Sequence, residues 1–170
     1  MRRAHGVPAV MALGIALIAI PAFTAPRPIL VWNASASVPA GLYAAQWPDA
    51  PAVGDLVLVR PPEPLGSWLA ERGYVGPDTP LLKRIAALPG QAVCRRGAII
   101  TIDGAHAARA EAQDRFARPL PAWRGCHVLR EGEFFLLNAG VAASLDGRYF
   151  GVLSQSAVVG RAVPLWTRAD

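Results

Sequence analysis

Proline and glycine recur along the chain after residue 25, and this is the strongest restriction on its fold. Each occurs 16 times in 170 residues. Proline removes a backbone donor and breaks helices, and glycine weakens the interior of a helix. Frequent interruptions of this kind favour short strands joined by turns. We therefore predict that residues 26–170 form one compact, mainly β domain.

The segment before this domain is different. Arg2 and Arg3 precede an uncharged apolar run from Val7 to Phe23. As a helix this run extends for about 25 Å, at the short end for a bilayer core of about 30 Å. Residues 1–25 are therefore predicted to be either a membrane anchor or a cleaved signal segment. The bulky Phe23 makes a poor cleavage site and favours one N-terminal transmembrane helix.

Arginines ahead of an apolar run place the N-terminus in the cytoplasm and the following chain outside. This predicts a single-pass protein of the inner membrane with residues 26–170 in the periplasm. Cys94 and Cys126 lie 32 residues apart. In an oxidising compartment we expect them to form a disulfide, whereas in the cytosol they are two buried thiols.

Charge and ligand spacing exclude several classes of function. The net charge of +5 comes from arginines scattered along the chain, so we predict no nucleic-acid partner and only a weak attraction to anionic inner-membrane lipid. The cysteines and the three histidines have no spacing typical of a metal site. The prediction is no metal and no cofactor.

Apolar patterns and turn residues predict the elements of the domain. Asp103-Gly104 is a strong hairpin signal. A short helix is expected over residues 67–72 with Ser67 as its cap, and a long loop over 109–125. Strands are predicted at 29–33, 42–47, 56–59, 81–88, 91–94, 98–102, 133–138 and 158–166.

Ser35 and Ser37 are the first candidates for chemistry. Residues two apart in an extended backbone point to the same face, so the two hydroxyls can converge. Pro39 and Gly41 follow at once and shape the backbone. Taken alone, such a stretch is typical of a surface turn.

Lys83 is the only lysine of the chain and lies in an apolar predicted strand. If its side chain alternates outwards, the amine is simply solvated. If it is buried, desolvation disfavours the charged form and the amine loses its proton more easily. A neutral lysine can then act as a general base for a serine hydroxyl.

Three motifs together resemble the conjugative-transfer signal peptidases, the TraF family, which belong to the type I signal peptidase superfamily. They are Ser-Val-Pro-Ala-Gly-Leu-Tyr at 37–43, Leu-Leu-Lys-Arg-Ile-Ala-Ala-Leu-Pro-Gly at 81–90 and Ser-Leu-Asp-Gly-Arg-Tyr-Phe-Gly at 144–151. The resemblance implies a signal-peptidase-like β domain that uses a Ser-Lys dyad. Val38 is followed directly by Pro39, unlike ordinary type I signal peptidases, and this favours the conjugative branch.

The resemblance also implies roles for individual residues. Ser37 is the expected nucleophile and Lys83 the expected general base. The Ser35 hydroxyl is expected in the oxyanion hole with the backbone N–H of Ser37. Ser144 is expected to orient the lysine, and Asp146 and Arg148 to steady the site, the alternative for this last pair being a plain surface turn with a weak ion pair.

The implied function is a membrane-anchored serine endopeptidase that processes a pilin precursor for conjugative DNA transfer. Its expected partners are the membrane-associated precursor and the transfer machinery. Some members of the family also cyclise their product. Two alternatives remain: a general secretory signal peptidase, and a non-catalytic anchored subunit of a transfer or secretion apparatus.

Overall fold

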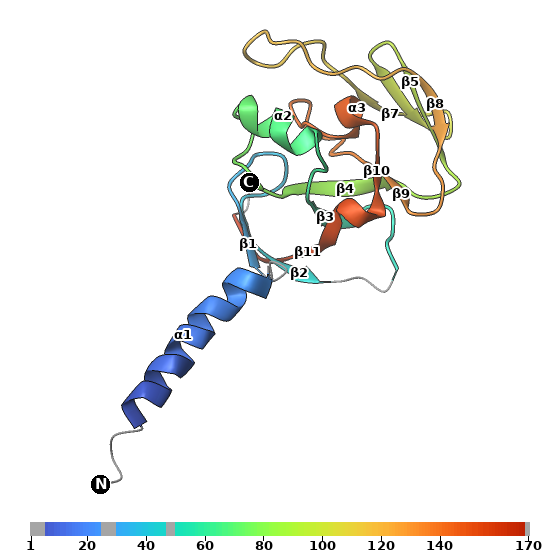
Figure 1. The fold of residues 1–170 in the computed structure, drawn as a ribbon. Coiled ribbons are helices and arrows are strands. Elements are labelled where there is room, and N and C mark those ends of the chain that lie inside the picture. The colour runs from blue at the N-terminus through green and yellow to red at the C-terminus, as the bar shows by residue number, and fades with distance from the viewer. Residues whose placement is uncertain (1–5, 25–29, 47–49, 169–170) are drawn as a thin grey trace.

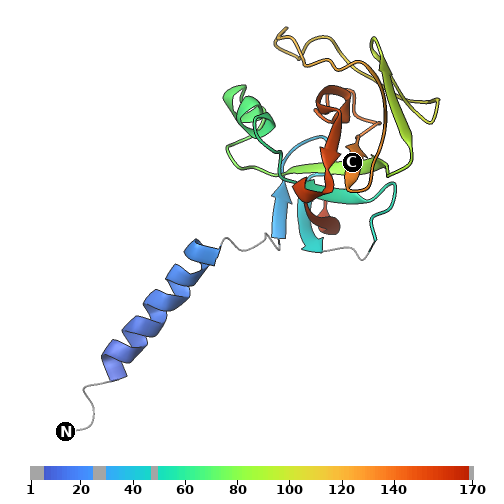
Figure 2. The same cartoon turned by 45° about the vertical axis from the view of Figure 1, so that its right-hand side comes forward.

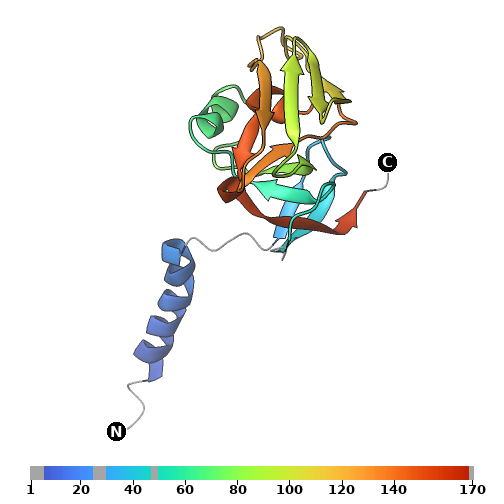
Figure 3. The same cartoon turned by 90° about the vertical axis from the view of Figure 1, so that its right-hand side faces the viewer.

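The computed structural model describes residues 6–24, 30–46 and 50–168. Helix α1 (Gly6–Thr24) covers the apolar run (Figure 1) and is separate from the strands in Figures 2 and 3. Its 19 residues extend for about 28 Å, slightly less than the about 30 Å of a bilayer core. No helix in the described ranges combines the length and the apolarity that a membrane crossing requires. The predicted transmembrane helix is therefore not supported, although a helix does form there.

The domain is built from two antiparallel sheets. The larger has seven strands in the order β1-β2-β11-β3-β4-β9-β10, and the smaller has the order β7-β6-β5-β8. The smaller sheet lies at the end of the domain farther from α1 (Figure 3). The strands are β1 (Leu30–Asn33), β2 (Gly41–Gln46), β3 (Leu56–Val59), β4 (Leu81–Ala87), β5 (Ala92–Arg96), β6 (Ile99–Ile102), β7 (Ala105–Arg109), β8 (Gly125–Val128), β9 (Glu133–Leu136), β10 (Val152–Ser154) and β11 (Val158–Thr167).

The predicted mainly β class is confirmed, and each predicted strand has an observed counterpart within the described residues. The helices differ more. Helix α2 (Leu65–Glu71) begins after Pro64 and not at Ser67. The predicted cap is wrong because the Ser67 hydroxyl donates to the Glu63 carboxylate, 2.6 Å away. Helix α3 (Gly147–Phe150) was not predicted, and neither was the 3₁₀ turn η1 (Gln155–Ala157).

Strands β3 and β4 are neighbours in the middle of the larger sheet, and most of their side chains are buried. All four residues of β3 are buried, and β4 follows it in antiparallel register. The apolar side chains of these strands contribute to three core clusters in the described residues, one around Ile85 and Phe134, one around Leu58 and Tyr43, and, through Ala87, one around Phe135. The buried side chains of β4 are therefore held in a rigid and largely dry part of the molecule, whereas Arg84 is exposed.

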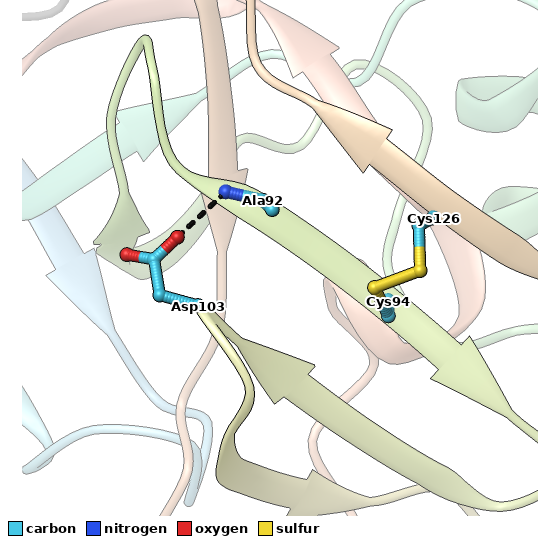
Figure 4. Close-up of a disulfide and its surroundings, with 4 residues drawn as sticks. All are labelled: Ala92, Cys94, Asp103 and Cys126. Carbon is cyan, nitrogen blue, oxygen red and sulfur yellow. Dashed lines mark hydrogen bonds between the residues drawn. A yellow bond between two sulfur atoms is a disulfide. The ribbon is translucent and has the colours of Figure 1, made fainter.

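The predicted disulfide is confirmed. Cys94 of β5 and Cys126 of β8 lie directly opposite each other in the smaller sheet and are bonded (Figure 4). The predicted hairpin at Asp103-Gly104 joins β6 and β7, and both residues have positive φ angles. The Asp103 carboxylate accepts a hydrogen bond from the backbone N–H of Ala92 at 2.8 Å, which ties this turn to β5 (Figure 4).

Removal of the disulfide is expected to destabilise the domain. The bond closes a loop with a sequence separation of 32, and loop closure of that size restricts the unfolded chain by about 3–4 kcal/mol. Urea unfolding of the Cys94→Ser, Cys126→Ser double variant is predicted to give a free energy lower by about this amount. Wild-type protein unfolded with a reductant is the control and should approach the variant. Equal stability in oxidised and reduced forms would contradict the prediction.

Candidate active site

Lys83 lies in the middle of β4 with its side chain inside the protein, at 5% exposure. Its Nζ donates a hydrogen bond to Ser144 Oγ at 2.9 Å. Burial lowers the pKa of the amine from 10.5 to about 8, while Asp146 raises it and Arg148 lowers it. At pH 7 about one amine in ten is then neutral, against about one in 2,500 for a solvated lysine. The alternative of a solvated lysine is thus excluded.

Asp146 and Arg148 form a buried ion pair and not a surface turn. Both are 1% exposed. Arg148 Nε lies 2.9 Å from Asp146 Oδ1, and Arg148 Nη2 lies 2.9 Å from Asp146 Oδ2. Nη2 also donates to the carbonyl of Ser144 at 3.1 Å and to that of Val141 at 2.6 Å. The ion pair therefore fixes the loop from which Ser144 reaches Lys83.

The backbone around this ion pair is tightly packed. The Asp146 side chain caps α3 by accepting from the backbone N–H of Arg148. A Cβ atom at Gly147 would lie 2.6 Å from Phe135 Cε2 and 2.7 Å from the carbonyl oxygen of Leu136. Only glycine fits there without displacing the sheet.

Asn33, at the end of β1, holds the loop that carries the two candidate serines. Its buried amide nitrogen shares hydrogen bonds with the carbonyls of Ser35, Val38 and Pro39 at 3.0–3.1 Å. Its Oδ1 accepts from the backbone N–H and the hydroxyl of Ser35. The Val38 side chain packs into the core next to Tyr43. The loop is therefore held both by the hydrogen bonds of Asn33 and by the packing of Val38.

Ser35 and Ser37 converge as predicted, with 3.0 Å between their hydroxyl oxygens. The Ser35 hydroxyl donates to Asn33 Oδ1 at 2.8 Å. A hydroxyl carries a single proton, so Ser37 is the donor in the contact between the serines. In this arrangement the Ser35 proton is directed at Asn33 Oδ1 and not towards the position of an oxyanion. The Lys83 amine donates its hydrogen bond to Ser144.

Asn138 connects the serine loop to the lysine strand. Its Nδ2 donates to the carbonyls of Ser37 at 3.1 Å and Leu82 at 3.2 Å, and its Oδ1 accepts from the backbone N–H of Arg84 at 3.0 Å. Two of these contacts are thus made to the residues on either side of Lys83 in β4. No role for Asn138 or Asn33 was predicted from the sequence, where the only signals were the position of Asn33 beside the serine loop and that of Asn138 at the end of a predicted strand.

A cavity of about 610 Å³ lies over this junction. Its walls come from residues 34–40, 53–54, 84–85 and 137–141. Both candidate serines line it, while Lys83 is not among its lining residues. An extended peptide placed in this cavity would pass beside Ser37.

The family model "Signal peptidase, peptidase S26" matches residues 2–166. The chain therefore belongs to the S26 family of signal peptidases. A conjugal transfer protein TraF of Agrobacterium fabrum is 36% identical over 147 residues, covering 79% of this chain and 81% of its own. A plasmid transfer protein TraF of Escherichia coli is 31% identical over 140 residues, covering 75% and 77%. The predicted relationship to the TraF proteins is confirmed.

Among solved structures, a signal peptidase I from Enterococcus faecalis covers 66% of this chain and 97% of its own, at 19% identity and a TM-score of 0.39. This similarity is too low to carry an inference about individual residues. The roles of the site residues thus rest on the contacts within this chain.

Asn138→Ala is predicted to destabilise the domain by about 1–3 kcal/mol, because it leaves the buried Leu82 carbonyl and Arg84 N–H without partners. If Asn138 also positions Ser37, the variant should lower kcat more than it raises KM. Urea unfolding and peptide-cleavage kinetics measure the two effects. The matched control is Gln113→Ala, outside the cavity. Loss of stability with unchanged kcat would restrict Asn138 to a structural role.

Proposed function

We propose that the protein is a serine endopeptidase with Ser37 as nucleophile and Lys83 as general base. The observation that carries this proposal is the buried Lys83 amine, whose pKa is lowered to about 8 and which donates to Ser144. Asn138 links the lysine strand to the carbonyl of Ser37. A Ser-Lys dyad requires the amine within hydrogen-bond reach of the serine hydroxyl, so the Ser37 hydroxyl, which donates to Ser35 in this structure, has to turn towards Lys83 for the reaction.

The geometry suggests how the groups would act. A neutral amine that donates one hydrogen to Ser144 keeps its lone pair for the Ser37 proton. Ser37 Oγ then attacks the peptide carbonyl, and the backbone N–H of Ser37 with the Ser35 hydroxyl would stabilise the oxyanion. For this the Ser35 proton has to turn from Asn33 towards the substrate. The protonated lysine returns its proton to the leaving amine, and water releases the acyl group.

We further propose that the substrate is a pilin precursor and that the protein works with a conjugative transfer apparatus. The names of its relatives, "Conjugal transfer protein TraF" and "Plasmid transfer protein TraF", support the link to conjugative transfer. The Cys94–Cys126 disulfide supports a periplasmic site of action, because such bonds persist in oxidising compartments. Attack on the acyl-enzyme by the amino terminus of the same acyl chain, in place of water, would release the Ser37 hydroxyl and cyclise the product.

Ser37→Ala and Lys83→Ala are each expected to reduce precursor processing by about 10²–10⁴-fold or more, the range for loss of a general base or nucleophile. Because the neutral amine is the active form, kcat/KM should rise with pH and level off above the lysine pKa of about 8. Cleavage of the co-expressed precursor by mass spectrometry, and peptide kinetics from pH 6 to about pH 9.5, measure these effects.

Ser156→Ala, an exposed serine of η1, is the matched control and should process normally. Intact processing by Lys83→Ala, with the protein folded, would favour a non-catalytic subunit. Cleavage of ordinary exported preproteins in cells lacking their usual enzyme would favour a general signal peptidase.

A further inference from the structure

The cavity beside Ser37 has an uneven distribution of charge. Its walls are mostly small or apolar, with Ala34, Ala36, Val53 and Val141 among the lining residues. Arg84 is the one charged residue among those that line it in the described part of the chain. A carboxylate does not occur in this wall, so the positive charge is not neutralised within the cavity.

Contacts place the Arg84 guanidinium at the edge of this cavity. Its Nη1 donates to the carbonyl of Gly54 at 3.0 Å, and Gly54 is itself a lining residue. The Tyr43 hydroxyl donates to the carbonyl of Pro39 in the same wall. Tyr43 is close enough to Arg84 for the charge of the guanidinium to act on it. Burial raises the pKa of the Tyr43 phenol, and the positive charge of Arg84 acts against that rise.

Arg84 has donors to spare. A guanidinium carries five N–H donors, and in the described ranges its side chain makes one hydrogen bond and no ion pair. The side chain is exposed, so a ligand can reach it. Arginine matches the geometry of a carboxylate and can bind it through two parallel hydrogen bonds.

We infer that Arg84 selects peptide substrates that carry an acidic side chain close to the scissile bond, among small apolar neighbours. This inference rests on the proposed peptidase function, because it concerns what occupies the cavity beside Ser37. The backbone N–H of Arg84 is held by Asn138 whatever its side chain, so the charge can be changed without removing that link. Arg84 would then determine specificity and not take part in bond cleavage.

The test measures binding to the full-length Ser37→Ala protein, so that it does not depend on catalysis. The probes are short fluorescent peptides of alanine and serine in which one position in turn holds Glu, Gln or Lys. At one or two positions the Glu peptide should bind about two- to fivefold more tightly than its Gln analogue, as expected for one accessible charge pair. This preference should decrease as ionic strength rises.

The Arg84→Gln change in the same background should remove the preference for Glu, and Arg84→Glu should reverse it in favour of Lys. Arg96→Gln is the matched control, because Arg96 is an exposed arginine of β5 outside the cavity. The inference is overturned if no Glu peptide binds more tightly than its Gln analogue, or if the preference survives in Arg84→Gln. Failure of the proposed function would appear separately, as cleavage of the precursor by Ser37→Ala.

Discussion

The burial of the Lys83 amine is the interaction on which the rest of the site depends. Lowering its pKa from 10.5 to about 8 corresponds to about 3 kcal/mol of disfavoured charge at neutral pH. Because the folded-state pKa is the lower one, this destabilisation is fully present below about pH 8 and disappears as the pH rises towards 10.5. The fold tolerates this destabilisation because the pairing of β4 with β3 and β9 holds the Lys83 side chain in the interior. A stability cost retained at one residue is typical of functional sites.

Polar side chains that bond to backbone groups build the frame around this amine. Arg148 binds four carbonyls and Asp146 within the segment from Asn138 to Asp146. Asn33 organises the serine loop, and Asn138 joins that loop to β4. Each of these side chains is buried, and hydrogen bonds such as those of Asn138 to the Leu82 carbonyl and of Arg148 to Asp146 are made away from competing water. The site is thus positioned by a network of amides and one ion pair, which leaves the serine hydroxyls at the cavity wall.

Local sequence patterns predicted strands such as Leu56–Val59, which consist of β-branched and apolar residues bounded by turns, but did not predict the short strands β8 and β10. The same reasoning left the orientation of Lys83 open, since a lysine in an apolar strand can face either side. The roles of Asn138 were not predictable, because its partner Ser37 is 101 positions away in the chain. The start of α2 was missed because Glu63, outside the helix, takes the Ser67 hydroxyl that a cap would have used. The apolar run predicted a helix correctly, but its expected passage through a membrane is not supported by the described residues.

The protonation of Lys83 can be measured directly, because it is the only lysine of the chain. Selective ¹⁵N labelling of lysine therefore places a single side-chain amine signal in the nuclear magnetic resonance spectrum. The account predicts that this signal titrates with a midpoint of about 8 in the folded protein and shifts towards 10.5 in urea. A midpoint near 10.5 in the folded state would contradict it, because the amine would then be charged and unable to accept the Ser37 proton at physiological pH.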